Sequence, residues 1–384
     1  MPGIISERKR IKESNMCFTI SPQQDMPCIS KGSPQLRSKV ASDSYVPLLP
    51  GLPDDVAKLC LSLVPRTNFP AMAAVSKQWR SFIQSEEFMT IRGQGGMLEE
   101  WMYMLTMDDE GKSHWEVLDC LGNKPHVVPP MPSELKAGFG VVVLHGKLLV
   151  LAGCIVSEAG ASATSDVYQY DSRLNSWSKL TSMNVARYHF ACAEVNGLVY
   201  AVGGYGEDGE SLSSSEVYDP KTNEWTLIEP LRCPRWGCFA CGFNGKLYVM
   251  GGRSTFTIGN SKFVHVYDTE KQSWYEMKNG CVMVIAHAVL DKKLYCIEWK
   301  DQRKLSIFNP EDNSWEMVPV PVTGSLSVGF QFGILDGKLL LFSLREEPGY
   351  RTLLYDPEAP SGSDWKTSNI KPSGSCLCSV TIKA

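Results

Sequence analysis

The sequence has little excess charge, no long apolar run and no Asn-x-Ser/Thr glycosylation site. Its 384 residues include 38 basic and 42 acidic side chains, a net charge of −4, which argues against a protein built chiefly to hold nucleic acid. No stretch approaches the roughly 18 apolar residues of a membrane span, and the N-terminus lacks the apolar core of a secretion signal. We therefore expect a soluble protein of the cytoplasm, the nucleus or both, with no nucleic acid or membrane partner.

Cysteine is plentiful, but its distribution does not predict disulfides. The thirteen cysteines are odd in number and scattered along the chain, whereas disulfide scaffolds pack them densely in short chains. Cys238 and Cys241 lie three positions apart in an apolar run, and in a strand such positions face opposite sides of the sheet, so they should not ligate one metal ion. Cys192 and Cys241 each close a Phe-Ala-Cys segment. We expect reduced cysteines that act mainly as small buried residues.

Residues 1–45 predict a disordered arm. They mix Ser, Pro, Gln, Lys and Arg without periodicity, and seven basic against four acidic residues give this arm a charge of +3. The run Arg8-Lys9-Arg10-Ile11-Lys12 is either a nuclear address or ordinary solvated charge.

Residues 46–92 predict a small helical module. Pro53, Asp54 and Asp55 are typical of a helix start, because proline needs no N–H there and carboxylates meet the positive end of the helix dipole. An apolar stripe with helical spacing follows and ends before Pro65: Val56, Leu59, Cys60, Leu63 and Val64. A second stripe comprises Met72, Val75, Trp79, Phe82 and Ile83. Two or three short helices bury only a small core, so the module either leaves apolar surface for a partner or packs on the next domain.

This module resembles an F-box. The resemblance rests on Leu52-Pro53-Asp54, on an apolar helix before Val64-Pro65, and on the segment VSKQWRSFI at 75–83, in which Ser76 stands where the family often has cysteine. It implies that a Skp-type adaptor protein binds the module. The residues that match the family's adaptor-facing positions are Leu52, Pro53, Val56, Cys60, Leu61, Val64 and Val75.

From about residue 100 the chain repeats a pattern of four strands. One landmark is a tryptophan seven residues after an aromatic residue, looser in the last case: Tyr170/Trp177, Tyr218/Trp225, Tyr267/Trp274, Phe308/Trp315 and Tyr355/Trp365. The other is a two-residue turn between apolar runs: His145-Gly146, Asn196-Gly197, Asn244-Gly245, Asp291-Lys292 and Asp336-Gly337. Asn-Gly and Asp-Gly favour tight hairpins because both residues of the turn need a positive φ. Units of 41 to 50 residues, the spacing of the tryptophans, have the size of a propeller blade.

These repeats resemble the kelch repeat, with its apolar hairpin, Gly-Gly pair, Val-Tyr-Asp-Pro and tryptophan. The resemblance is clearest at 188–232 and 236–279, and weaker at 283–319 and 327–370, where the glycine pair is missing. We predict a mainly β chain with a six-bladed propeller over residues 98–384. The expected blades are 101–132 plus 375–382, 137–184, 188–232, 236–279, 283–319 and 327–370, so that the C-terminal segment completes the first blade and closes the ring. Within 101–132 we expect three strands, at 101–105, 115–118 and 126–128.

No motif predicts catalysis or a bound cofactor. Residues 204–209 match GxGxxG, but a phosphate site needs a helix at the last glycine, and the chain here leads into another strand. The six histidines have no local spacing typical of metal ligands. A propeller can still gather distant residues at its axis, as copper oxidases of kelch architecture do, so a kelch-type oxidase remains an alternative.

The expected binding face of the propeller combines its B–C loops with the connections between blades. In a four-strand meander these segments emerge on one side, where arginine, tyrosine and tryptophan often anchor interfaces. The predicted contacts to a substrate are Arg187, Tyr188, Arg235, Trp236, Arg253 and Arg303. A structural role at blade junctions is the alternative for these residues.

An F-box followed by kelch repeats is similar to the plant F-box/kelch-repeat proteins. The resemblance implies a non-catalytic substrate receptor of an SCF ubiquitin ligase, joined through the adaptor to a cullin and a RING subunit, which binds an unidentified target protein. The sequence itself lacks the zinc spacing of a RING domain. Besides the oxidase, the alternative is a scaffold that binds partners without directing their degradation.

Overall fold

The computed structural model describes residues 47–134, 136–157, 160–254, 263–278, 280, 284–298, 301–321, 329–343, 352–360 and 362–384, with only the backbone of 301–303. The expected disordered arm and its basic run lie outside these residues, as do parts of the expected binding-face loops, at 255–262, 299–300 and 344–351. Residues 47–384 form one compact unit.

The helical module contains four short helices rather than the two or three expected. They are α1 (Asp54–Ser62), α2 (Phe69–Val75), α3 (Lys77–Gln84) and α4 (Glu86–Gln94), with a 3₁₀ turn, η1 (Arg66–Asn68), after α1. Two serines divide the chain here, because Ser76 Oγ accepts from the Trp79 N–H at 3.1 Å and Ser85 Oγ from the Phe88 N–H at 3.2 Å, each capping a new helix. The core of the module consists of Leu61, Phe69, Met72, Ala73, Phe82, Ile83 and Phe88.

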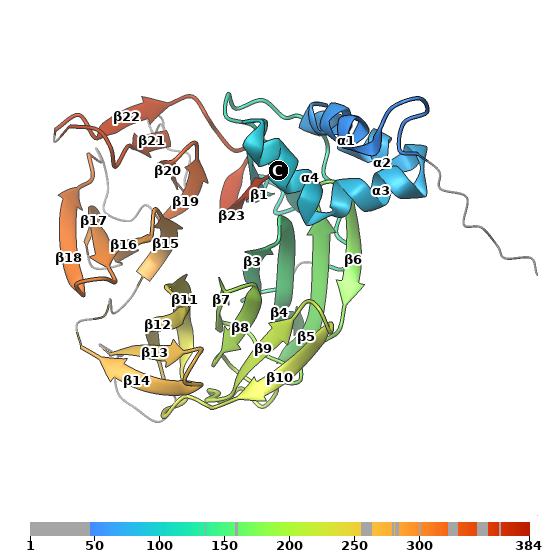
Figure 1. Cartoon of the computed structure of the whole chain (residues 1–384). Coiled ribbons are helices and arrows are strands. Elements are labelled where there is room, and N and C mark those ends of the chain that lie inside the picture. Colours follow the sequence, from blue (N-terminus) through green and yellow to red (C-terminus); the bar gives the residue numbers. More distant parts are fainter. Residues whose placement is uncertain are drawn as a thin grey trace, which may run out of the picture. The chain divides into compact units, whose positions relative to one another are not determined.

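The rest of the described chain forms six antiparallel sheets around an axis, as predicted (Figure 1). The first sheet contains β1 (Glu100–Met107), β2 (Ser113–Leu118) and β23 (Ser375–Lys383). The second contains β3 (Gly140–Leu144), β4 (Lys147–Ser157), β5 (Gly160–Asp171) and β6 (Ser176–Leu180), and the third β7 (Ala191–Val195), β8 (Leu198–Val202), β9 (Ser215–Asp219) and β10 (Glu224–Ile228). The fourth contains β11 (Trp236–Phe243), β12 (Lys246–Arg253), β13 (Val264–Asp268) and β14 (Ser273–Met277). The fifth contains β15 (Val284–Leu290), β16 (Lys293–Glu298), β17 (Asp301–Asn309) and β18 (Ser314–Pro319), and the sixth β19 (Phe330–Leu335), β20 (Lys338–Ser343), β21 (Thr352–Tyr355) and β22 (Trp365–Ser368).

The two sequence landmarks of the repeat have the expected geometry. In all five predicted hairpin turns both residues have a positive φ, between 47° and 79°. Each aromatic pair joins the last two strands of its blade, with ring centroids 4.9–5.2 Å apart. Local turn chemistry and cross-strand ring contacts therefore set the register of each blade.

The C-terminal strand closes the ring, as predicted. In β23, Ile382 lies opposite Trp101 of β1, and Ser379 and Thr381 donate hydrogen bonds to the carbonyls of Phe332 and Ile334 on β19 of the neighbouring blade. The last segment of the chain thus holds the first and last blades together.

The prediction of a strand at residues 126–128 was wrong, and the first blade has three strands. The segment bonds instead to side chains of the second blade, where Asn175 donates to the Val127 carbonyl at 3.1 Å and Trp177 to the Pro129 carbonyl at 2.8 Å. Three prolines, at positions 125, 129 and 130, remove N–H donors that a ladder with β2 would need.

None of the helices in the described part of the chain has the length and the apolar character of a membrane span.

Candidate partner-binding surfaces

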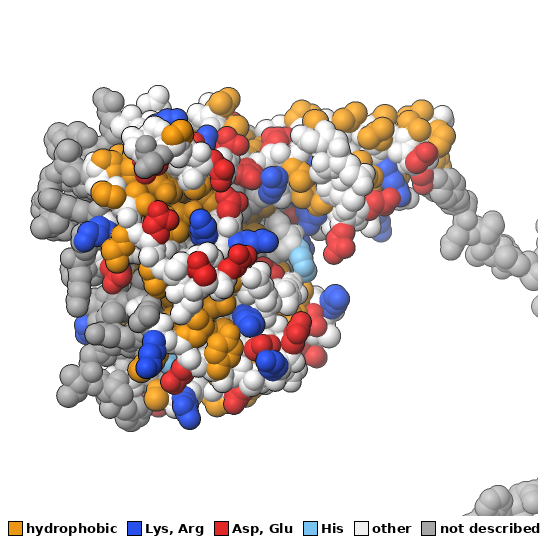
Figure 2. Space-filling model, turned by 60° about the vertical axis from the view of Figure 1, so that its left-hand side comes forward, with side chains coloured by type: hydrophobic (Ala, Val, Ile, Leu, Met, Phe, Trp, Pro, Cys, Tyr) orange, Lys and Arg blue, Asp and Glu red, His pale blue; other side chains and the backbone are white. Residues whose placement is uncertain are grey.

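The first candidate surface is an apolar face on the helical module. Five large apolar side chains are exposed there, namely Leu52 (40%), Val56 (40%), Leu59 (51%), Leu63 (51%) and Val75 (62%). Figure 2 shows apolar side chains gathered along the outer edge of the helices. The apolar stripe of the first helix therefore points to solvent and does not pack on the propeller.

The predicted adaptor contacts divide between this face and the core. Pro53 and Cys60 are exposed beside the five side chains above, and Val64 is half-buried. Leu61 is 4% exposed and packs in the helical core, so the prediction that it contacts an adaptor is wrong. Leu59 and Leu63 were part of the predicted stripe but not of the predicted contacts, although their spacing already put them on the same side as Val56.

The second candidate surface lies on the propeller, and burial removes Arg187 from it. Arg187 and its ion-pair partner Glu216 both have fully buried side chains, with Nη2 2.8 Å from Oε1. The guanidinium also donates to the carbonyls of Gly203 at 2.7 Å and Ser214 at 3.1 Å. Burial lowers the pKa of Arg187, and the Glu216 carboxylate opposes that shift. The Arg187 side chain therefore joins the end of β8 to the start of β9 in the third blade, and the prediction that Arg187 contacts a substrate is wrong.

Arg235 repeats this arrangement in the next blade, with a histidine in place of the glutamate. Its side chain is buried at 4% exposure, and Nη2 donates to Nδ1 of His265 at 2.8 Å. His265 Nε2 lies 3.2 Å from Oε1 of Glu276. Burial, followed by the charge of Arg235, lowers the pKa of His265 to about 4, so the neutral ring accepts from Arg235 and donates to Glu276. The prediction that Arg235 contacts a substrate is also wrong, because its guanidinium is buried and bonded to His265.

Three aromatic rings form a row on this face, which we call the aromatic row: Tyr188, Tyr205 and Trp236. The Tyr205 ring lies between the other two, with centroids 5.2 Å from Tyr188 and 4.7 Å from Trp236, and it stacks on Trp236 at 24°. All three side chains are half-buried. Exposed Arg253 pairs in the β11–β12 ladder with Trp236. The side chain of Arg303 lies outside the described residues.

The glycine pair of the kelch repeat places the aromatic row. Gly203 and Gly204 have positive φ, and a Cβ on them would strike the carbonyl oxygens of Arg235 and Tyr188. Because the two backbone segments lie so close together, the Tyr188 N–H donates to the Tyr205 carbonyl at 3.1 Å, and the Tyr205 N–H donates to the Tyr188 carbonyl at 2.8 Å. Sequence reasoning missed Tyr205, although its place directly after the glycine pair is a usable signal.

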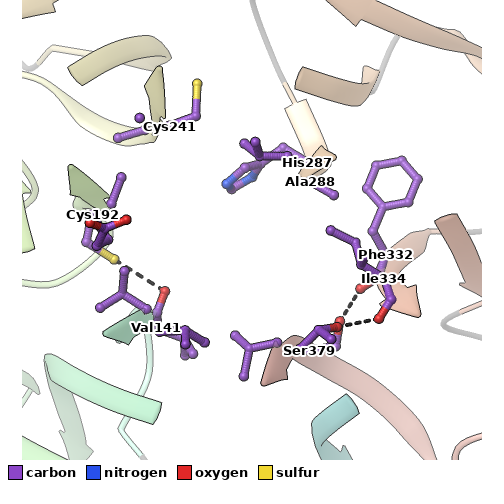
Figure 3. A pocket seen from close by; sticks show the side chains of 17 residues that line it. Val141, Cys192, Cys241, His287, Ala288, Phe332, Ile334 and Ser379 are labelled. Carbon is purple, nitrogen blue, oxygen red and sulfur yellow. Dashed lines mark hydrogen bonds between the residues drawn. The ribbon is translucent and has the colours of Figure 1, made fainter. Parts of the chain in front are cut away.

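A cavity of about 330 Å³ lies on the propeller axis, and the innermost strand of each blade lines it (Figure 3). Its wall includes Val141, Cys192, Cys241, His287, Ile334 and Ser379. Desolvation raises the pKa of Cys192 to about 12, so this residue stays a neutral thiol. Within the described residues, no three His, Cys, Asp or Glu side chains are grouped to hold a metal.

The described cysteines are thiols, and most of them are wholly or partly buried. Cys238 and Cys241 do face opposite sides of β11, since each packs in a different core cluster. Three others, Cys60, Cys120 and Cys233, are exposed.

Comparisons with known proteins match both parts of this architecture. A family model described as F-box domain matches residues 49–90, and one described as KLHDC2/KLHL20/DRC7 Kelch-repeats domain matches residues 138–342. The Arabidopsis thaliana F-box/kelch-repeat protein At1g67480 is 60% identical over 383 residues, which cover 99% of each chain. The putative F-box/kelch-repeat protein At1g27420 from the same plant is 41% identical over 89% of this chain and 99% of its own. The chain belongs to the F-box/kelch-repeat protein family.

Proposed function

We propose that the protein is a substrate receptor of an SCF-type ubiquitin ligase. The F-box docks a Skp-type adaptor and, through it, a cullin and a RING subunit, while the propeller binds a target protein that is then ubiquitinated and degraded. The chain itself performs no chemistry in this proposal. It acts by proximity, because holding a target lysine near a loaded ubiquitin enzyme raises its effective concentration.

One observation carries the adaptor half of the proposal. A module of about 45 residues buries its own small core yet leaves five large apolar side chains at least 40% exposed. Exposed apolar side chains gathered on one face mark a protein interface, because the water around them is released when a partner covers them. The match to the F-box model over 49–90 supports a Skp-type adaptor as that partner.

The aromatic row is the proposed anchor for the target protein. Tyrosine and tryptophan offer large rigid contact areas and polar tips, and they are enriched in the few residues that dominate binding energy. Tyr188, Trp236 and Arg253 from the sequence prediction remain in this proposal, with Tyr205 added from the structure. Such a receptor would work in the cytoplasm, the nucleus or both, and tagging the protein with a fluorophore would test that location.

Affinity purification with the proteasome inhibited tests the proposal. The wild-type chain should recover a Skp-type adaptor, a cullin and one or more ubiquitinated targets. The double variant Leu52→Ala/Pro53→Ala should lose the adaptor and the cullin and keep the targets. A matched control, Leu121→Ala/Val127→Ala, removes two apolar side chains that are 79% and 84% exposed in the segment after β2, and it should keep the adaptor, the cullin and the targets.

Two results would count against the proposal. Adaptor recovery that survives the Leu52/Pro53 change would remove the F-box from the interaction. Targets whose abundance in cells does not change when the receptor is lost, while they still bind it, would favour the scaffold alternative over degradation.

A further inference from the structure

The link between the helices and the propeller centres on one buried arginine, Arg66. It lies in η1, directly after the helix that carries the apolar face, and its side chain is 1% exposed. A buried arginine is costly unless its donors are satisfied, so its partners show what it holds in place.

The partners of Arg66 belong to the first two blades of the propeller and to the segment before them. Nη1 donates to the carbonyls of Glu99 and Ile382, both at 2.8 Å, and Nη2 to Ser172 Oγ at 3.2 Å. The guanidinium lies over the Trp101 ring, 4.3 Å from its centroid. Ile382 belongs to β23, so a residue of the helical module bonds directly to the strand that closes the ring.

The same region also bonds to the end of α1, the helix that carries part of the exposed apolar face. Buried Arg92 donates to the carbonyls of Ser62 at 2.7 Å and Val64 at 2.8 Å, at the end of α1. The Glu99 carboxylate accepts from the Arg66 N–H at 3.1 Å and from Arg92 at 3.3 Å. The backbone of Glu99 pairs in both directions with Ala384, just beyond β23, at 2.9 and 3.0 Å. A continuous set of hydrogen bonds therefore runs from the end of α1 to the end of the closing strand.

We infer that Arg66 couples the F-box to the closure of the propeller. An adaptor bound to the helices and the pairing of β23 with β1 in the first blade then stabilise each other. Terminal strands are where a fold opens most easily, and β23 is the terminal strand on which ring closure depends. An adaptor stabilises the folded helices, which hold Arg66 in place, and by linkage the closed ring favours adaptor binding in return. Only this adaptor step rests on the proposed function.

Hydrogen exchange on the full-length chain tests the structural step without any partner. Arg66→Met should speed exchange in residues 375–384 and 100–107 by about tenfold or more, since it removes charged hydrogen bonds. The fourth blade, at 236–277, should be unchanged. Arg80→Met is the matched control, because Arg80 is an exposed arginine of the same module, and it should exchange as the wild type does.

Arg66→Lys keeps the result interpretable if the methionine variant does not fold. A lysine keeps the charge but not the planar fork that reaches Glu99, Ile382 and Ser172 together, so its exchange should lie between the wild type and Arg66→Met. Unchanged exchange at 375–384 in the folded variants would overturn the inference. So would faster exchange spread equally over all blades, because it would mean general destabilisation.

The adaptor step needs a recombinant Skp-type adaptor. Adding it should slow exchange at 375–384 in the wild type and should not do so in Arg66→Lys, even though pull-down shows that the variant still binds. An adaptor that binds the wild type without slowing this segment would overturn the linkage. An adaptor that does not bind at all would contradict the proposed function instead, and the partner-free comparison of Arg66 variants would still stand.

Discussion

The two candidate surfaces differ in how their residues are held. The helical face presents Leu52, Val56, Leu59, Leu63 and Val75, each at least 40% exposed. The aromatic row is half-buried, and its ring contacts join residues 17 positions apart, Tyr188 and Tyr205, and 31 positions apart, Tyr205 and Trp236. The first surface is a product of helical periodicity, and the second is a product of how two neighbouring blades meet.

This difference explains why substitutions should act differently on the two surfaces. On α1, the exposed apolar residues and the residues buried in the core of the module lie on different sides of the helix. On the propeller, the residues next to the aromatic row, Arg187 and Arg235, belong to the scaffold. Partner binding is therefore easy to separate from stability on the helices and harder to separate at the aromatic row.

The largest expected effect is at Arg187, and it tests whether that residue belongs to the scaffold. Arg187→Met should lower the free energy of unfolding by about 3–5 kcal/mol, because it leaves the buried Glu216 carboxylate without its counter-charge. Chemical denaturation measures the loss. Adding Glu216→Gln should restore part of it, since glutamine can still accept from the Asn184 N–H, which now bonds Glu216 at 2.8 Å. A fully stable Arg187→Met protein would contradict the structural role of Arg187 and would make this residue a candidate partner contact again.

A pair of leucines on α1 sharpens the comparison on the helical side. Leu61→Ala should lower the free energy of unfolding of the module by about 2–5 kcal/mol, because the side chain is buried. Leu59→Ala should leave thermal unfolding nearly unchanged and weaken adaptor binding by about tenfold. Calorimetry and titration with the adaptor measure the two quantities. Equal loss of stability in both variants would mean that the two sides of the helix are not separate.

Removal of the Trp236 ring should weaken partner binding more than stability. Trp236→Ala is expected to reduce recovery of the target protein by about 30-fold, equivalent to about 2 kcal/mol, while adaptor recovery stays constant. Quantitative mass spectrometry of the purified complexes gives the ratio. Tyr275→Ala, which removes an aromatic ring that is 40% exposed on β14, is the control. Equal target recovery from both variants would exclude the aromatic row as the anchor.

The last expected effect is a dependence of stability on pH. Burial is the main cause that lowers the pKa of His126 and of His265 to about 4, compared with about 6.5 in the unfolded chain. Between these values the unfolded chain binds protons that the folded chain does not, so stability should fall as the pH is lowered from 7 to 5. Melting temperatures measured along this range test the sign.

His265→Gln should make that fall shallower, since glutamine does not titrate yet can accept from Arg235 and donate to Glu276. The control is His145→Asn, in an exposed turn where asparagine tolerates the positive φ of 48°. An unchanged slope in His265→Gln would show that this histidine is not the group that titrates.

Much of the fold could be predicted from the sequence because its signals are local. Asn196-Gly197 and its equivalents form hairpins through the φ values of two residues, and Tyr218 and Trp225 meet across a single turn. The strand wrongly predicted at 126–128 is different, because the carbonyls of Val127 and of the neighbouring Pro129 accept hydrogen bonds from Asn175 and Trp177 of another blade. Local pattern could not show that competition.

The sequence by itself determined the repeat, the number of blades, the closing strand and which side chains share one side of a strand or helix. These follow from periods of two and 3.6 residues and from turn chemistry, which act over a few neighbours. Only the tertiary structure decided which side meets solvent, and so whether Leu61, Arg187 and Arg235 serve the scaffold or a partner. The physical reason is that burial depends on segments brought together from far along the chain, such as Arg66 and Ile382, which are 316 residues apart.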